Sequence, residues 1–414
     1  MSGQVQNLVA SLARDSTHRL VAALARRLGA GRIPIAEDAV QHALLQALSL
    51  WPFKGVPERP EAWLATVARN RALDLLRGEA RRAALAEDLL PLAQPTADND
   101  GRFDRELNDD ELALLFAVCH PALSPEMRVT FALKTVCGLT VPQIAAGLLG
   151  EPAAIAQRLV RARRQLEAAD VAIEPPPPEA LPERAETVRT ALYLVFNEGY
   201  SASSGESLTR ADLSGEAIRL GRLLVELLPE PEAMGLLALM LLHESRRAAR
   251  TGPTGELVLL DDQDRSRWSR EQIAEGTALV ERALGSRRIG PYTLQAAISA
   301  VHAEASTAAA TDWAQIVGLY DVLVRADPSP VIELNRAVAV AMRDGPAAGL
   351  ALIDAILARG ALADYHLAHS ARAELCRRLG RTTDARAAYE RALGLARQEP
   401  QRRFLERRLS ELLD

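Results

Sequence analysis

Residues 138–166 restrict the fold of this chain more than any other segment, because they contain two stretches of helical periodicity separated by a helix-breaking turn. In the first stretch, the apolar residues between Val141 and Leu148 recur at helical spacing. The turn contains Gly150 and Pro152, residues that end a helix. The apolar positions of the second stretch also share one helical face: Ile155, Leu159, Ala162 and Leu166. The segment therefore predicts two short helices joined by a tight turn.

The opposite face of the second helix is basic. Its polar residues are Gln157, Arg158, Arg161, Arg163 and Arg164. A short helix, a glycine turn and a basic second helix are the parts of a helix-turn-helix, whose second helix enters the major groove of DNA. There, Gln and Arg side chains contact base edges, and further Arg side chains contact phosphates. The same pattern also fits a helical hairpin whose arginine-rich face is only solvated.

The composition favours an all-α fold. Ala, Leu and Arg are abundant, aromatic residues make up only 4% of the chain, and few stretches alternate β-branched with polar residues. A chain of 414 residues is long enough for two or three domains with a substantial core. We therefore expect several helical domains and no extensive sheet.

The cysteines and the apolar runs bear on the cellular compartment. Cys119, Cys137 and Cys376 form no CxxC pair, and such sparse cysteine fits a reducing compartment. The N-terminus lacks the apolar core of a signal peptide, and no apolar run approaches a membrane span. We expect a cytoplasmic protein that contacts no membrane and requires no metal or cofactor.

Charge is unevenly distributed along the chain. The net charge of −5 arises beyond residue 172, because the preceding part has equal numbers of acidic and basic residues. Within that neutral part, residues 69–82 and 158–164 are rich in Arg, whereas residues 87–111 are strongly acidic. Two basic helices separated by an acidic connector suggest two contacts with one polyanion.

Two blocks of this part resemble a known family. Residues 36–48, AEDAVQHALLQAL, and residues 63–82, WLATVARNRALDLLRGEARR, look like domain 2 of extracytoplasmic-function sigma factors. The end of the helix pair, QRLVRARRQL at residues 157–166, looks like domain 4 of the same family, and the helices expected within residues 111–136 fit the first half of that domain. The blocks also follow the family's order along the chain.

The resemblance implies a sigma factor that directs bacterial RNA polymerase to promoters, with core RNA polymerase and promoter DNA as partners. Residues implied to bind the polymerase clamp are Glu37, Asp38, Gln41 and His42. Residues implied to contact the minus-ten promoter element, where a loop captures an unstacked base, are Trp51, Arg69, Asn70, Arg71 and Arg77. Residues implied to contact the minus-thirty-five element are Gln157, Arg158, Arg161 and Arg164. A basic groove with stacking side chains is also what holds single-stranded bases in general.

A proline-rich spacer at residues 174–179 precedes a long helical extension. Residues 365–400 match much of a tetratricopeptide repeat, with Gly380 ending its first helix, and residues 331–358 match one more weakly. The extension resembles that of a sigma-factor subgroup with a tetratricopeptide-like C-terminal domain. This resemblance implies that the extension regulates activity, through a protein partner or an intramolecular contact. The expected domains are sigma domain 2 at 1–85, an acidic linker at 86–110, sigma domain 4 at 111–172, a spacer at 173–182 and the repeat domain at 183–414.

Two alternatives remain open. The chain could be a helical-repeat scaffold that binds proteins and no DNA, in which the helix pair is only a packing hairpin. The extension could instead hold an enzyme site, although we expect no enzyme, because its polar residues match no complete catalytic or metal motif. Those residues are Glu198, His243, Glu244, Asp261, Asp262, Asp264, Arg265 and His302. The structural interpretation is that they pair with one another and cap helices.

Overall fold

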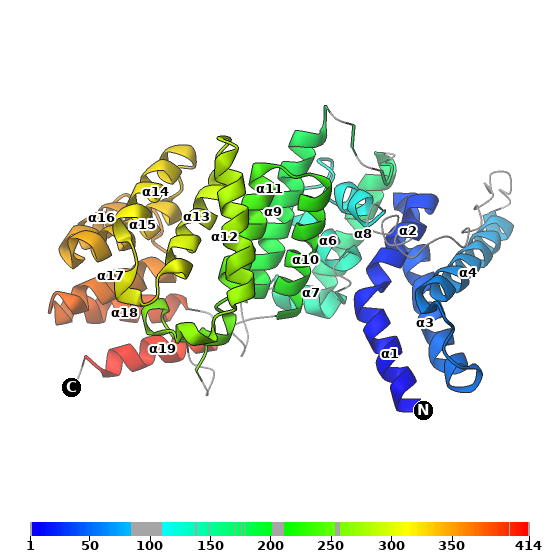
Figure 1. Ribbon diagram of the computed structural model, residues 1–414, viewed down its shortest axis with the longest axis horizontal. Coiled ribbons are helices and arrows are strands. Elements are labelled where there is room, and N and C mark those ends of the chain that lie inside the picture. The colour runs from blue at the N-terminus through cyan, green and yellow to red at the C-terminus, as the bar shows by residue number, and fades with distance from the viewer. Residues whose placement is uncertain are drawn as a thin grey trace. The chain divides into compact units, whose positions relative to one another are not determined.

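The computed structural model confirms the all-α prediction (Figure 1). It describes residues 2–83, 110–136, 139–148, 150–169, 171–174, 176–177, 179–200, 211–252, 257–396 and 398–412. Within these residues the structure contains helices and a single antiparallel bridge, between Thr251 and Leu257. The expected acidic linker lies outside the described residues except for Asp110. In the described part, no helix combines the length and apolar character that a membrane span needs.

The chain divides into two compact units. Residues 1–146 and 150–191 form unit 1, and residues 192–414 with the short piece 147–149 form unit 2. The division falls inside helix α9 (Leu181–Tyr200), beyond the proline-rich spacer that we expected to separate the domains. The expected domain boundaries themselves stay predictions.

Unit 1 begins with α1 (Ser2–Asp15), α2 (Thr17–Leu28), a short 3-10 helix η1 (Ala30–Arg32), α3 (Ile33–Lys54) and α4 (Pro60–Ala83). Ser16 lies between α1 and α2, and its buried hydroxyl donates a hydrogen bond to Glu61. Gly29 and Gly55 follow α2 and α3 with φ of 87° and 82°, a conformation that favours glycine. Helix α3 packs along α4 through faces rich in buried alanine, which let the two backbones approach closely.

The remainder of unit 1 contains helical residues 110–118, α6 (Pro125–Thr135), α7 (Val141–Gly147), α8 (Pro152–Ala168) and the start of α9. The apolar face predicted for the second helix of the pair is confirmed: Ile155, Leu159, Ala162 and Leu166 of α8 are buried. Helix α8 packs on α6, which begins at Ser124, where the side chain accepts a hydrogen bond from the Met127 backbone N–H. The exposed face of α8 is therefore the basic one.

Unit 2 is a succession of helices in which each packs on its neighbours in the chain. After α9 they are α10 (Ala211–Leu227), α11 (Pro231–Glu244), α12 (Arg270–Gly285), α13 (Pro291–Glu304), α14 (Trp313–Ala326), α15 (Pro330–Asp344), α16 (Pro346–Ala358), α17 (His366–Arg378), α18 (Thr382–Leu395) and α19 (Glu399–Ser410). Helix α11 is buried at every position from Ala233 to Leu242, between α10, α12 and α13. Gly380, predicted to end a helix, follows α17 with φ of 72°.

Candidate polymerase and promoter interface

One face of α3 is exposed along much of its length. Asp38 and Gln41, two of the residues expected to bind polymerase, lie on it. The face continues through Leu45 and Leu48, whose side chains are 65% and 40% exposed. Residues at this spacing share one side of a helix. The surface that α3 offers is therefore partly apolar, and we call Asp38, Gln41, Leu45 and Leu48 the α3 face.

The other two residues of the expected polymerase set lie differently. Glu37 is half-buried, and burial raises the pKa of its carboxyl group, while Lys134 and Arg163 nearby oppose that rise. Lys134 of α6 and Arg163 of α8 are therefore close enough to Glu37 to favour its charged form. His42 lies 3.2 Å from the Gln46 side chain along the same helix.

The residues expected to contact the minus-ten element lie on α4, with the exception of Trp51. Asn70 and Arg77 are exposed, and Arg77 forms an ion pair with Asp74 one turn earlier in the helix, at 3.3 Å. Arg69 and Arg71 are half-buried, and Arg71 lies 3.5 Å from Asp38 of α3. This ion pair places the polymerase set and the minus-ten set side by side on one α3–α4 surface.

The placement of Trp51 corrects one expectation. We expected Trp51 to lie in the loop that captures an unstacked base, but α3 continues to Lys54, and Trp51 is only 3% exposed. Its ring packs edge-to-face against Trp63 of α4, with 5.4 Å between the ring centres. Trp51 therefore belongs to the core between α3 and α4. The exposed aromatic ring of this region is Phe53, at 90%.

The basic face of α8 separates into two parts. Gln157, Arg161 and Arg164 are exposed, and Val160 is exposed beside them. Arg158 is half-buried, and its guanidinium donates a 3.3 Å hydrogen bond to the hydroxyl of Thr130 in α6. Three of the four residues expected at the minus-thirty-five element are thus exposed, whereas the fourth, Arg158, is half-buried and bonded to α6.

Sequence reasoning missed Leu45, Leu48, Phe53 and Val160. Leu45 and Leu48 continue the spacing from Asp38 and Gln41, so the helical period was a usable signal for them. No such signal distinguished Phe53 from Trp51, because both lie beside Pro52 and the end of the helix depends on how α3 packs.

The polar residues considered for catalysis in unit 2 make structural contacts. Arg265 donates hydrogen bonds to the backbone carbonyls of His302 and Ala305, at 2.6 and 2.7 Å, and so caps the end of α13. Glu244 forms a 3.0 Å ion pair with Arg247 just after α11. These contacts confirm the capping and pairing interpretation for Arg265 and Glu244.

The two histidines among these residues are held neutral. Burial lowers the pKa of His243 well below its ordinary value, and its ring nitrogen lies 3.1 Å from the hydroxyl of Ser299. Burial, with Arg246 and Arg265 nearby, lowers the pKa of His302 to about 4. A neutral histidine packed among arginines fits a structural role.

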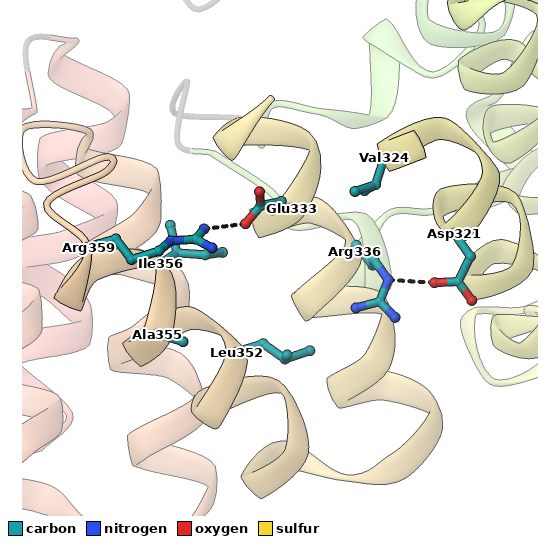
Figure 2. Close-up of a pocket in the computed structure, with 8 residues that line it drawn as sticks. All are labelled: Asp321, Val324, Glu333, Arg336, Leu352, Ala355, Ile356 and Arg359. Carbon is teal, nitrogen blue, oxygen red and sulfur yellow. Dashed lines mark hydrogen bonds and ion pairs between the residues drawn. The ribbon is translucent and has the colours of Figure 1, made fainter. Parts of the chain in front are cut away.

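A groove of about 400 Å³ lies between α14, α15 and α16 of unit 2 (Figure 2). Two ion pairs flank it, Arg336 with Asp321 at 2.6 Å and Arg359 with Glu333. Figure 2 shows Leu352 of α16 between the two pairs. Because its four charged side chains neutralise one another, the groove favours no particular charge in a ligand.

Comparison with known proteins matches two separate parts of the chain to known families. Residues 14–82, which include α2, α3 and most of α4, match the family described as Sigma-70 region 2. Residues 184–284 match a family of unknown function (DUF6596). "Uncharacterized protein R00370" of Rhizobium meliloti (strain 1021) is 44% identical over 384 residues, which are 92% of this chain and 90% of that protein. No solved structure matches. The chain therefore belongs to the same protein family as the Rhizobium protein, and its match to Sigma-70 region 2 over residues 14–82 supports a sigma factor that acts in transcription initiation.

Proposed function

We propose that this protein is an extracytoplasmic-function sigma factor whose α3 face binds the clamp of core RNA polymerase. The observation that carries the proposal is that α3 and α4 fall within the match to region 2, and that α3 exposes Leu45 and Leu48 there. Exposed aliphatic side chains flanked by polar residues suit a protein partner, because their burial supplies most of the binding free energy. The exposed Asn70 and Arg77 on α4 then lie near the melted promoter strand.

In this proposal, α7 and α8 act as a helix-turn-helix on the minus-thirty-five element. The support is the exposed row of Gln157, Arg161 and Arg164 on α8, opposite its buried apolar face. Gln and Arg can contact base edges, and Arg can neutralise phosphates. Val160 lies on the same exposed side and can contact a thymine methyl group.

Unit 2 is proposed to be a tetratricopeptide-like domain that regulates the sigma factor in the cytoplasm. Its support is the helix pair α15–α16 with Gly345 between the helices, the pair α17–α18, and the buried Ala385, Tyr389 and Ala392 at packing positions. These features do not identify a ligand or partner of unit 2.

The test of the whole proposal is transcription in vitro with the full-length protein, core polymerase and promoter DNA. We expect the protein to form a complex with core polymerase and to direct initiation from a specific start site. A pure, folded protein that neither binds core polymerase nor directs any initiation would refute the proposal and favour a helical scaffold.

Arg161→Ala and Arg164→Ala are each expected to weaken promoter binding about three- to tenfold. Each arginine that contacts a phosphate displaces about one counterion, so the slope of log affinity against log salt should fall by about one per substitution. The measurement is a salt titration of holoenzyme binding to promoter DNA. Arg325→Ala, which removes an exposed arginine of α14 in unit 2, is the matched control. Unchanged slopes for both variants would exclude phosphate contacts by α8.

Phe53→Ala is expected to reduce promoter opening about tenfold without affecting polymerase binding. Stacking of a base on an aromatic ring contributes about 1–3 kcal/mol, and Phe53 is the exposed ring that replaces the buried Trp51 in this role. The measurement is the permanganate reactivity of promoter thymines. The control is Val56→Ala, in the loop that follows α3. If the Phe53→Ala and Val56→Ala proteins open the promoter to the same extent, Phe53 does not stack on a promoter base.

A further inference from the structure

Residues 110–168 pack against region 2 within unit 1 through contacts that we call the clasp. Arg26 of α2 forms an ion pair with Asp110, and His18 of α2 lies 3.7 Å from the carboxylate of Glu111. The His18 and Glu111 side chains are only 8% and 0% exposed. A carboxylate is rarely buried to this extent at a transient surface contact, because its desolvation is costly unless partners remain in place.

A second part of the clasp joins α8 to the beginning of α3. The side chain of Glu167 lies so close to η1 that a Cβ added to Gly31 would be 3.3 Å from it. Lys134 of α6 and Arg163 of α8 are near enough to Glu37 to influence its pKa, which burial raises. The clasp therefore lies beside Glu37, the first residue of the polymerase set, whereas the α3 face beyond Glu37 stays exposed.

The clasp leaves the proposed DNA-binding row uncovered. Gln157, Arg161 and Arg164 remain exposed, whereas Arg163 is partly buried and close enough to Glu37 to influence its pKa. Polymerase and residues 110–168 would thus compete at the N-terminal end of α3, and DNA would not be excluded from α8.

We propose that the clasp holds residues 110–168 on a surface of region 2 in the free protein. Core polymerase must displace residues 110–168 from this surface when it binds. The inference depends on the proposed function, because the competitor is core polymerase. The inference adds that residues 110–168 hinder polymerase binding in the free protein without the help of any other protein.

The experiment reverses and then restores the charge of one clasp pair in the full-length protein. Arg26→Asp and Asp110→Arg each place like charges together, and the double variant Arg26→Asp/Asp110→Arg restores an ion pair. We expect each single variant to bind core polymerase about five- to tenfold more tightly and to exchange backbone amide hydrogens of residues 110–118 faster. The double variant should return both quantities towards the wild-type values. The matched control is Arg27→Asp, which changes the same charge at the next exposed position of α2 and should alter neither.

The outcomes separate the clasp from the proposed function. Unchanged amide exchange in both single variants would overturn the clasp. Faster exchange with unchanged or weaker polymerase binding would overturn the competition, since the contact would then exist without opposing polymerase. If no variant and no wild-type protein bound core polymerase, the proposed function and the competition would both fail, whereas the exchange data would still show whether the clasp exists.

Discussion

Replacing Leu45 with Asp is expected to lower the affinity of this protein for core RNA polymerase about 100-fold. Leu45 is the most exposed leucine of α3, at 65%, and lies between Gln41 and Leu48 on the α3 face. If this face binds the clamp, Leu45 is buried in the complex, and a carboxylate there would lose its hydration without gaining a partner. Losses of 2 kcal/mol or more are typical when a central apolar contact of an interface is removed.

Binding of the purified full-length variant to core polymerase, measured by fluorescence anisotropy or calorimetry, checks this result. Leu48→Asp, closer to the end of the face, should act in the same direction with a smaller effect. The matched control is Leu367→Asp on α17, where a leucine of similar exposure to Leu48 lies in unit 2. Because Leu45 is exposed, none of these variants should lose helical content. Wild-type affinity in the Leu45→Asp protein would exclude the α3 face as the polymerase site.

Glu232→Ala is expected to destabilise unit 2 by about 3 kcal/mol. The carboxylate of Glu232 on α11 accepts hydrogen bonds from the backbone N–H groups of Gly290, Tyr292 and Thr293, at 3.0–3.2 Å, and from the hydroxyl of Thr293 at 2.6 Å. It thereby satisfies the free donors at the start of α13 and places a negative charge where the helix dipole favours one. Hydrogen bonds to a charged group contribute about 1.5–3 kcal/mol each, and removing the acceptor leaves several donors unpaired.

Hydrogen–deuterium exchange of peptides from α11 and α13 in the full-length protein measures this change in unit 2 alone. Glu232→Gln is the control, because its amide oxygen can still accept part of the network at nearly the same volume. We expect Glu232→Gln to destabilise unit 2 by about half as much as Glu232→Ala does. If exchange in α13 is the same in the alanine variant as in the wild type, the start of α13 does not depend on Glu232.

Local features of this structure could be predicted from sequence, whereas contacts between distant segments could not. The period of Ile155, Leu159, Ala162 and Leu166 predicted the buried face of α8, because one helix decides which of its residues share a side. The burial of Trp51 was missed because it depends on Trp63 of another helix and on the extension of α3 through Pro52. The expected roles of the individual interface residues stay predictions.

Long-range polar partners had no sequence signal at all. Glu232 and Thr293 are separated by 61 positions, and Arg26 and Asp110 by 84, so neither pair follows from a helical period or a motif. The charges themselves were visible, since Asp110 belongs to the acidic stretch that we expected to be a linker. Its place at the start of a helix that packs on α2 depends on tertiary packing that only the structure supplies.

The burial of α11 on all sides has a consequence for how this extension can vary among relatives. A helix with no solvent-facing side cannot lose a neighbour without exposing a row of leucines to water, so the α10–α13 block is expected to be inherited as a whole.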